Sequence, residues 1–163
     1  MNPNLRIFKF VVAVLGFILF VADRILKYYF YKNPALVLGG DFFYNLLSFH
    51  FVRNFGIAFG LPFFWPVLIV LIFIILLFLI GLLINQIKSG DLFLSAATLL
   101  IVIGAGSNLI DRLRYGFVID YIDLTWFTVF NLADCMITIG VFIFLIQSIV
   151  KKPHTFDKSI KLS

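Results

Sequence analysis

The chain is dominated by long apolar segments without charged side chains. The clearest is residues 63–84, where Leu, Ile, Val and Phe follow one another with no charge between them. A helix of about 20 apolar residues, rising 1.5 Å per residue, crosses the hydrocarbon core of a bilayer. Hydrophobic residues make up 63% of the chain, against about 45–50% in a soluble domain. The sequence therefore predicts an integral membrane protein.

Three further segments fit the same interpretation. Residues 92–110 carry no charge, and residues 132–150 are interrupted only by Asp134. Residues 10–22 are shorter, but they reach the length of a span if Lys9 extends its amine to the interface. We expect an all-α membrane protein with one integral membrane domain over residues 1–163 and transmembrane helices at about 7–27, 63–84, 92–114 and 131–150.

The connections between these helices differ in character. Residues 85–91 are a short polar turn, typical of an antiparallel helix pair. Residues 33–62 are longer, and within them residues 47–51 alternate apolar and polar side chains, the period of a strand. Residues 115–130 are rich in β-branched and aromatic side chains and predict a short strand or an interfacial segment. We expect a small β-rich region outside the cytoplasm.

The distribution of basic residues bears on orientation and partners. The net charge is +5, and the basic residues flank the apolar segments, which favours membrane lipid rather than nucleic acid as their partner. Seven lie on the side of the two termini and six on the other side. The lysine-rich tail at 151–163 favours cytoplasmic termini. Asp23 follows the first apolar segment, which indicates a retained anchor rather than a cleaved signal peptide.

Acidic residues gather in one apolar stretch. Residues 104–140 hold four of the eight acidic residues, and all eight are Asp. A carboxylate in or near lipid is costly and is retained mainly where it has a function. The predicted topology brings polar side chains from distant segments to one outer face, as an active site requires. These side chains are Asp23, Asn54, Asn108, Asp111, Arg112, Asp120, Asn131 and Asp134.

Asp120 and Asp134 are the candidate catalytic pair. Two neighbouring carboxylates share a proton, so one can activate a water while the other protonates a carbonyl oxygen. This chemistry needs neither a metal nor a cofactor, and the two histidines and the cysteine are not placed as metal ligands. The pattern predicts a paired-carboxylate site at a membrane surface that can activate a water for attack on a carbonyl.

Each carboxylate also has a purely structural interpretation. The sole role of Asp134 could be to stabilise the start of a helix that begins after Asn131. Asp120 could be a solvated loop carboxylate. If its segment is extended, Asp120 faces one way and Asp123 the other, so Asp123 is expected to face away from the site.

The remaining polar residues are interpreted as support. Asn108, Asp111 and Arg112 share a helix face and form a polar clamp, in which the arginine can hold a carboxylate. Asp23 and Lys27 are four residues apart and can pair. Residues 104–107 are small and favour close helix packing. His50 is expected to be exposed and Cys135 to be a small buried hydrophobe.

Two other functions use the same residues. A small transport or proton-conducting bundle would need the carboxylates but no peptide substrate. A structural assembly subunit would need neither aspartate. The long connection at 33–62 favours a protease, because a simple conduit has little use for it.

Several motifs in a fixed order resemble a known family. They are D-x-x-x-K at 23–27, NFGIAFG at 54–60, NLIDR at 108–112, GFVIDYID at 116–123 and FNLAD at 130–134, followed by Thr138 and Gly140. Together they resemble lipoprotein signal peptidase, the signal peptidase II family of aspartic peptidases, over about residues 20–145. The resemblance departs from the family at Ser107, Ile57 and Cys135, and in the short connection between the two aspartates.

The resemblance implies a bacterial inner-membrane endopeptidase whose active site lies at the extracytoplasmic face. Its substrates would be prolipoproteins, cut immediately before a cysteine that carries a diacylglyceryl group. Asp120 and Asp134 would be catalytic. The supporting and substrate-binding residues would be Asp23, Lys27, Asn54, Gly56, Asn108, Asp111, Arg112 and Asn131.

Overall fold

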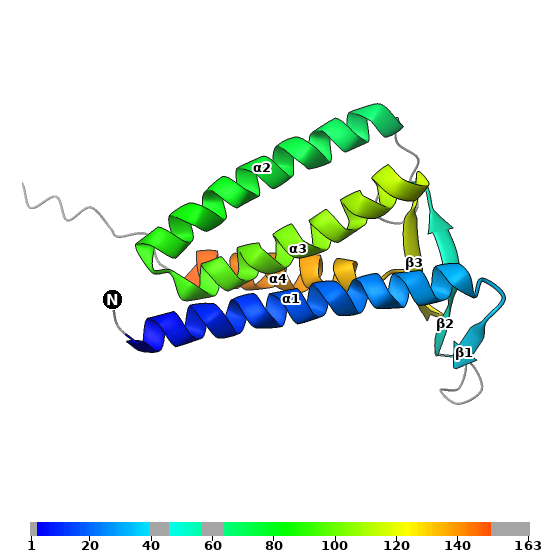
Figure 1. Ribbon diagram of the computed structural model, residues 1–163, viewed down its shortest axis with the longest axis horizontal. Helices are drawn as coiled ribbons and strands as arrows, with labels where there is room; N and C mark the ends of the chain where they lie inside the picture. The colour runs from blue at the N-terminus through cyan, green and yellow to red at the C-terminus, as the bar shows by residue number, and fades with distance from the viewer. Residues whose placement is uncertain (1–2, 40–45, 57–63, 151–163) are drawn as a thin grey trace, which may run out of the picture.

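A computed structural model describes residues 3–39, 46–56 and 64–150. Helices lie side by side, and a small sheet crosses one end of them (Figure 1). In chain order the elements are α1 (Pro3–Lys32), β1 (Val37–Gly39), β2 (Leu47–Asn54), α2 (Trp65–Ser89), α3 (Leu92–Tyr115), β3 (Val118–Leu124) and α4 (Leu132–Val150). The predicted tail at 151–163 lies outside the described residues.

Helix α3 is the centre of the helical layer, and α1, α2 and α4 all pack against it. Glycines let α3 and α4 approach closely. A Cβ atom on Gly104 would lie 2.5 Å from the Ala133 carbonyl oxygen, and one on Gly140 would lie 2.6 Å from the Ala97 carbonyl oxygen. The prediction of close packing at Gly104 is therefore confirmed, and it brings the start of α4 against α3.

The helices expose long apolar surfaces. On α1, Phe10 and Phe17 are 70% and 67% exposed, and on α2, Phe78 is 69% exposed. Surfaces of this kind are expected to face lipid. Among the described residues, α2 and α3 are long and apolar enough to cross a membrane, so the expected count of four spans stays a prediction.

The helix bounds differ from the predicted ones. Helix α1 begins earlier than residue 7 and continues past residue 27 to Lys32, because Asp23 and Lys27 are completely buried and do not mark the end of an apolar segment. Helix α2 continues past residue 84 and ends where Gly90 adopts a left-handed conformation, with φ of 77°.

The sheet is antiparallel, with the strand order β1-β2-β3. Both predicted strand segments are confirmed, as β2 and β3. Val52 pairs with Asp120 and Asn54 pairs with Val118, so the end of β2 lies beside Asp120. The sheet is attached to α1 by the ring of Phe30, which stacks on Tyr121 at 5.1 Å.

We expect Gly140→Ala to destabilise the protein, by about 1–3 kcal/mol, because the new methyl group meets the Ala97 backbone. Gly81→Ala is the matched control, since a Cβ atom there has no neighbour within 4 Å and alanine favours helix. Thermal unfolding in detergent measures both. Equal stability of the two variants would contradict close packing at Gly140.

Candidate active site

The two candidate aspartates share a neighbour, Asn131, where the sheet joins the helices. Asp120 lies in β3, and Asp134 lies in the first turn of α4. Asp120 is 1% exposed, whereas Asp134 is partly exposed. The polar residues predicted for the site come to this junction from α1, β2, α3 and the residue before α4.

Asp120 is held by two amide side chains. Its Oδ1 accepts a hydrogen bond of 2.6 Å from Asn131 Nδ2, and its Oδ2 accepts one of 2.9 Å from Asn54 Nδ2. Neither donor carries a charge. The carboxylate is therefore fixed in position without a cation bound directly to it.

Asp134 is held in a similar way. Its Oδ1 accepts a hydrogen bond of 2.8 Å from Asn108 Nδ2, and its Oδ2 accepts one of 3.2 Å from the Asn131 backbone N–H. The Asp134 N–H in turn donates to Asn131 Oδ1 at 2.9 Å. This reciprocal arrangement is a capping box, so the expected cap at Asn131 is confirmed. Asn131 therefore contacts both aspartates.

Side chains accept the hydrogen bonds of the backbone N–H groups at the start of α4. The Leu132 N–H donates to the Tyr121 hydroxyl at 3.1 Å, and the Ala133 N–H donates to Asp23 Oδ1 at 3.1 Å. Backbone N–H groups at a helix start otherwise lack partners. The strand β3 and the helix α1 thus fix the position from which Asp134 projects.

A network of buried charges lies beneath the aspartates. Lys27 Nζ is 2.8 Å from Asp111 Oδ2 and 3.3 Å from Asp23 Oδ2, and all three side chains are 0% exposed. Arg24 Nη1 lies 2.6 Å from Asp111 Oδ1. Lys27 also donates to Asn108 Oδ1 at 2.7 Å. The expected pair of Asp23 and Lys27 is confirmed, and it extends into a network of two cations and two anions.

The predicted polar clamp differs from the structure in its partners. Arg112 was expected to be able to hold a carboxylate, but it donates to the Gly56 carbonyl oxygen at 3.0 Å and to the Asn108 carbonyl oxygen at 3.4 Å. The Gly56 N–H donates to Asn54 Oδ1 at 3.0 Å. Arg112 thus secures the end of β2, whereas Asp111 takes its cations from α1.

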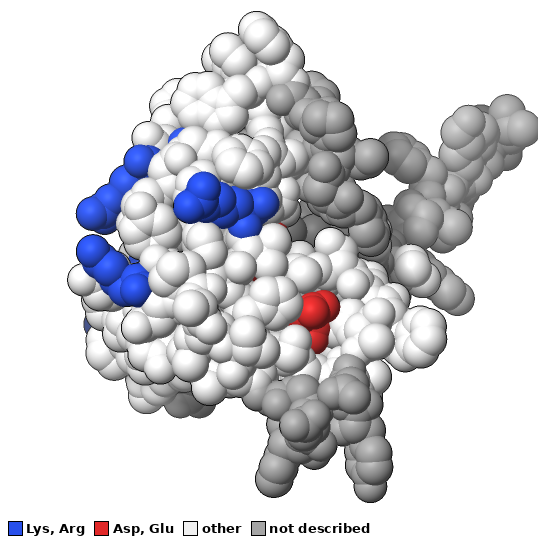
Figure 2. All heavy atoms as spheres, turned by 90° about the vertical axis from the view of Figure 1, so that its right-hand side faces the viewer, with Lys and Arg blue, Asp and Glu red and all other residues white. Residues whose placement is uncertain are grey.

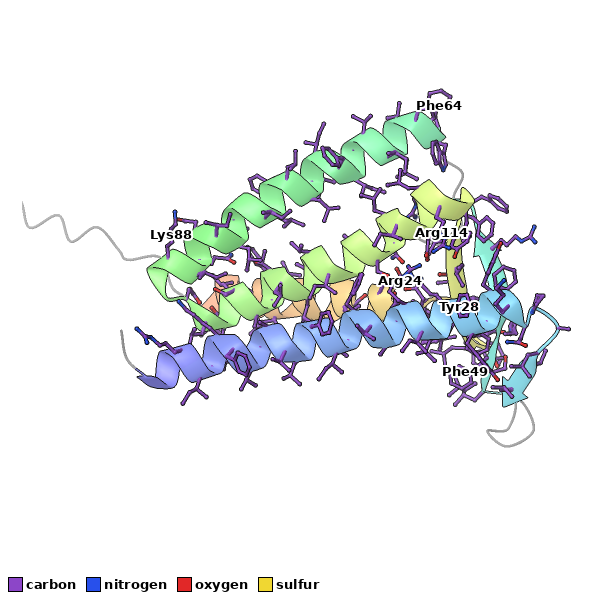
Figure 3. The ribbon with its side chains drawn as sticks, in the orientation of Figure 1. Arg24, Tyr28, Phe49, Phe64, Lys88 and Arg114 are labelled. Atoms are coloured by element: carbon purple, nitrogen blue, oxygen red, sulfur yellow. The ribbon has the colours of Figure 1, made fainter. Side chains whose placement is uncertain are left out.

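Three residues belong to the site although no sequence pattern predicted them there. Arg24 was counted only as a flanking basic residue, but its side chain lies between α1 and α3 (Figure 3). Ser107 was interpreted as packing, but its hydroxyl donates to Asp23 Oδ2 at 2.5 Å and accepts from Arg24 at 3.2 Å. Tyr121 was not considered. The four-residue spacing of Ser107 and Asp111 on α3 was the available signal for the first two.

Asp123 and His50 lie on the sheet away from this network. Asp123 faces away from the aspartate pair, as predicted, and Ser48 donates to its Oδ2 at 3.4 Å. His50 was expected to be exposed, but it is partly buried, with Nδ1 3.9 Å from Asp123 Oδ2. Ile57 lies outside the described residues.

The surroundings of Asp120 raise its pKa. Burial is the largest cause and the Asp134 carboxylate is the next, and together they raise the pKa of Asp120 to about 6. The hydrogen bonds from Asn54 and Asn131 act in the opposite direction, because they stabilise the ionised form. Near neutral pH, Asp120 can therefore gain or lose a proton.

An apolar groove of about 740 Å³ leads to the site. Leu68 and Ile72 of α2 line one side, and Cys135 and Thr138 of α4 line the other. Its polar lining is Asn54, Asn108, Arg112, Thr128, Asp134 and Thr138. Asp120 does not line the groove, although its partner Asn54 does. Cys135 is only partly buried, contrary to the expectation of a buried residue, because it faces this groove.

Comparisons with known proteins agree on one family. A family model described as signal peptidase (SPase) II matches residues 15–150. A lipoprotein signal peptidase from Bartonella henselae is 40% identical, over 89% of this chain and 94% of its own. One from Streptococcus agalactiae serotype Ia is 30% identical, over 85% of this chain and 91% of its own.

A solved structure shares the fold. It is described as a bacterial membrane enzyme, it has a TM-score of 0.74 and 25% sequence identity, and it covers 93% of this chain and 94% of its own. On these relatives and on the family model, the chain belongs to the signal peptidase II family.

Proposed function

We propose that this chain is a membrane aspartic endopeptidase that removes signal peptides from prolipoproteins with Asp120 and Asp134 as its catalytic pair. The family is one of aspartic peptidases, and the relatives are named lipoprotein signal peptidases. The observation that carries the residue assignment is the position of Asn131, which bonds both carboxylates. Family membership favours a peptidase over a conducting bundle or an assembly subunit.

The reaction uses one shared proton on the pair. The ionised carboxylate takes a proton from a water, whose oxygen forms a bond to the scissile carbonyl carbon. The protonated carboxyl gives its proton to the carbonyl oxygen. When the tetrahedral intermediate breaks its C–N bond, the proton taken from water passes to the leaving nitrogen. One hydroxyl of the intermediate returns its proton to the other carboxylate as the C=O bond forms again. The pair is then ready to share a proton again.

The amide side chains around the pair suit this exchange. Asn54, Asn108 and Asn131 each donate to a carboxylate, and an amide stays neutral throughout the reaction. A cation in the same place would hold both carboxylates ionised. The buried cation Lys27 instead reaches Asp134 through Asn108. Asn54 both bonds Asp120 and lines the groove, whereas Asp120 does not line it.

The groove fits the substrate class. A signal peptide is a short apolar segment, and the groove offers apolar side chains from α2 and α4 with Asp134 among its lining. The scissile bond, before a cysteine that carries a diacylglyceryl group, would lie where the groove meets the polar junction. The lipid chains would then extend along the apolar helices.

The same arrangement supports a proposed membrane topology. Helices α1 to α4 cross the bacterial cytoplasmic membrane as one domain over residues 1–163, with both termini in the cytoplasm. The sheet end and the aspartate pair lie at the extracytoplasmic face. Support comes from the exposed apolar surfaces of the helices, and from the position of the polar side chains at one end of them.

Asp120→Asn and Asp134→Asn are each expected to abolish cleavage of a lipidated precursor, with a loss of at least about a thousandfold. The amide cannot take up or share the proton, although it keeps the shape of the carboxyl group. Asp123→Asn is the matched control, because it makes the same change on β3 and faces away from the pair. Rates are measured with purified protein in detergent, alongside thermal unfolding.

Normal cleavage by either the Asp120 or the Asp134 variant would exclude the pair. Loss of cleavage in the Asp123 variant, with the fold intact, would place the catalytic carboxylate elsewhere on β3.

The pH dependence of cleavage tests the hydrogen bond from Asn54. Raising the pH above the pKa of the pair removes the shared proton, so kcat/KM falls on the alkaline side. Asn54 favours ionised Asp120. Asn54→Leu removes this donor and still excludes water, so the pKa of Asp120 rises and the alkaline limb moves to higher pH.

Ser48→Ala is the control for this measurement, because Ser48 lies on the same strand but bonds Asp123. Its alkaline limb should match that of the unmodified protein. A limb that stays in place or moves to lower pH in Asn54→Leu would show that Asn54 does not act on the titrating group.

A further inference from the structure

The sheet end of the molecule carries exposed basic side chains that the active site does not use. Lys32 ends α1, Arg53 lies in β2 and Arg114 lies in the last turn of α3, and all three are exposed. In the view onto this end, Lys and Arg side chains gather on one side, and the acidic surface seen there lies apart from them (Figure 2).

A continuous cluster of aromatic rings lies beneath these cations. Tyr31 contacts Tyr115 at 4.6 Å and Phe51 at 5.9 Å, and Phe117 contacts the rings of Tyr115 and Phe51 at 6.0 and 6.2 Å. The four rings therefore form a closed circuit of contacts from α1, β2, α3 and the residue before β3. The cluster packs three elements, α1, β2 and α3, against one another beneath the cations.

The two arginines lie over rings of this cluster. The Arg53 guanidinium carbon is 5.4 Å from the centroid of Phe117, and that of Arg114 is 5.3 Å from the centroid of Tyr115. Lys32 Nζ lies 5.8 Å from the centroid of Tyr28, one turn earlier on α1. We refer to Lys32, Arg53 and Arg114 with their rings as the basic–aromatic patch.

The cations of the patch differ from those of the site. Arg24 and Lys27 are paired with buried carboxylates. Within the part of the chain that the structure describes, Lys32, Arg53 and Arg114 form no ion pair with a carboxylate. Stacking on a ring leaves the N–H donors of a guanidinium available. The patch therefore presents positive charge that is not neutralised by its described surroundings.

The patch continues into exposed apolar surface. Tyr28, whose ring belongs to the patch, is 58% exposed. Leu113, next to Arg114 on α3, and Phe55, directly after β2, are 61% and 63% exposed. A surface for a soluble acidic partner has no need of such a border. Basic and aromatic side chains above exposed apolar side chains match the layers of a membrane surface, where phosphates lie above acyl chains.

We propose that the basic–aromatic patch binds the headgroups of anionic phospholipids in the leaflet next to the active site. Arg53 and Arg114 bind phosphate oxygens through their guanidinium groups, and Lys32 adds a third charge. The tyrosines lie at the level of the headgroups. This rests on the proposed placement of the sheet end at the membrane surface. The patch would hold the mouth of the groove at the depth where a lipidated substrate arrives.

The test is photo-crosslinking in lipid nanodiscs. The full chain is placed in phosphatidylcholine discs that contain a trace of phosphatidylglycerol with a photoactivatable headgroup, and crosslinked peptides are mapped by mass spectrometry. We compare the triple variant Lys32→Gln, Arg53→Gln, Arg114→Gln with a matched triple variant at the opposite end, Arg6→Gln, Lys9→Gln, Lys88→Gln. Cleavage of a precursor is measured in detergent for each.

We expect crosslinks to β2 and to the ends of α1 and α3. In the patch variant the yield of these crosslinks should fall by roughly fivefold for each charge removed. The matched variant should keep them, and a phosphatidylcholine probe with the same headgroup label should not give them. Unchanged crosslinks in the patch variant, or an equal loss in both variants, would overturn the proposal. So would displacement by inorganic phosphate or by an acidic peptide as effectively as by unlabelled phosphatidylglycerol.

The detergent assay separates this proposal from the proposed activity. Cleavage by the patch variant with loss of the crosslinks supports the lipid site on an active enzyme. Absence of cleavage by the unmodified protein would count against the proposed peptidase activity. The crosslinking results would then still support or overturn the lipid site by the outcomes given above.

Discussion

The buried charges between α1 and α3 are the constraint on which the site depends. Removing Asp23, Lys27 and Asp111 from water costs several kcal/mol for each ion, and their mutual attraction offsets that cost only in good geometry. Asp23 and Asp111 are balanced by Lys27 and Arg24, and each anion has a cation within 3.3 Å. The same groups hold the elements that carry the aspartates. Asp23 caps α4, and Lys27 orients Asn108, which bonds Asp134.

Much of the fold and of the site could be predicted because both rest on local patterns. Uncharged apolar runs predicted the helices, and alternation predicted the strand that became β2. The spacing from Asn131 to Asp134 predicted the cap. The separation of Asp120 from Asp123 followed from the period of a strand, which turns successive side chains to opposite faces. Motif order predicted the family.

The rest depended on contacts between distant segments. Arg24 has no local partner, and its role appears only when α1 packs on α3 and brings it to Asp111. Arg112 carries the charge expected of a carboxylate partner, but the returning end of β2 offers it a carbonyl oxygen instead. Helix α1 continues past its predicted end to Lys32, because Asp23 and Lys27 pair with each other inside the protein. A sequence pattern alone predicts that a charged residue is exposed. An ion pair with a distant segment allows the same residue to be buried, and the pattern does not show that segment.

The two aspartates come from different kinds of structure, and that explains where the site lies. Asp120 is carried by a strand of the polar end, and Asp134 by the first turn of an apolar helix. A pair made of one residue from each can only form at the boundary between the two regions. Under the proposed function, a substrate whose apolar segment lies among the helices would present its end to the carboxylate pair at that boundary. Asn131 belongs to neither β3 nor α4, but it joins them. Its backbone N–H donates to Asp134, and its side-chain amide donates to Asp120.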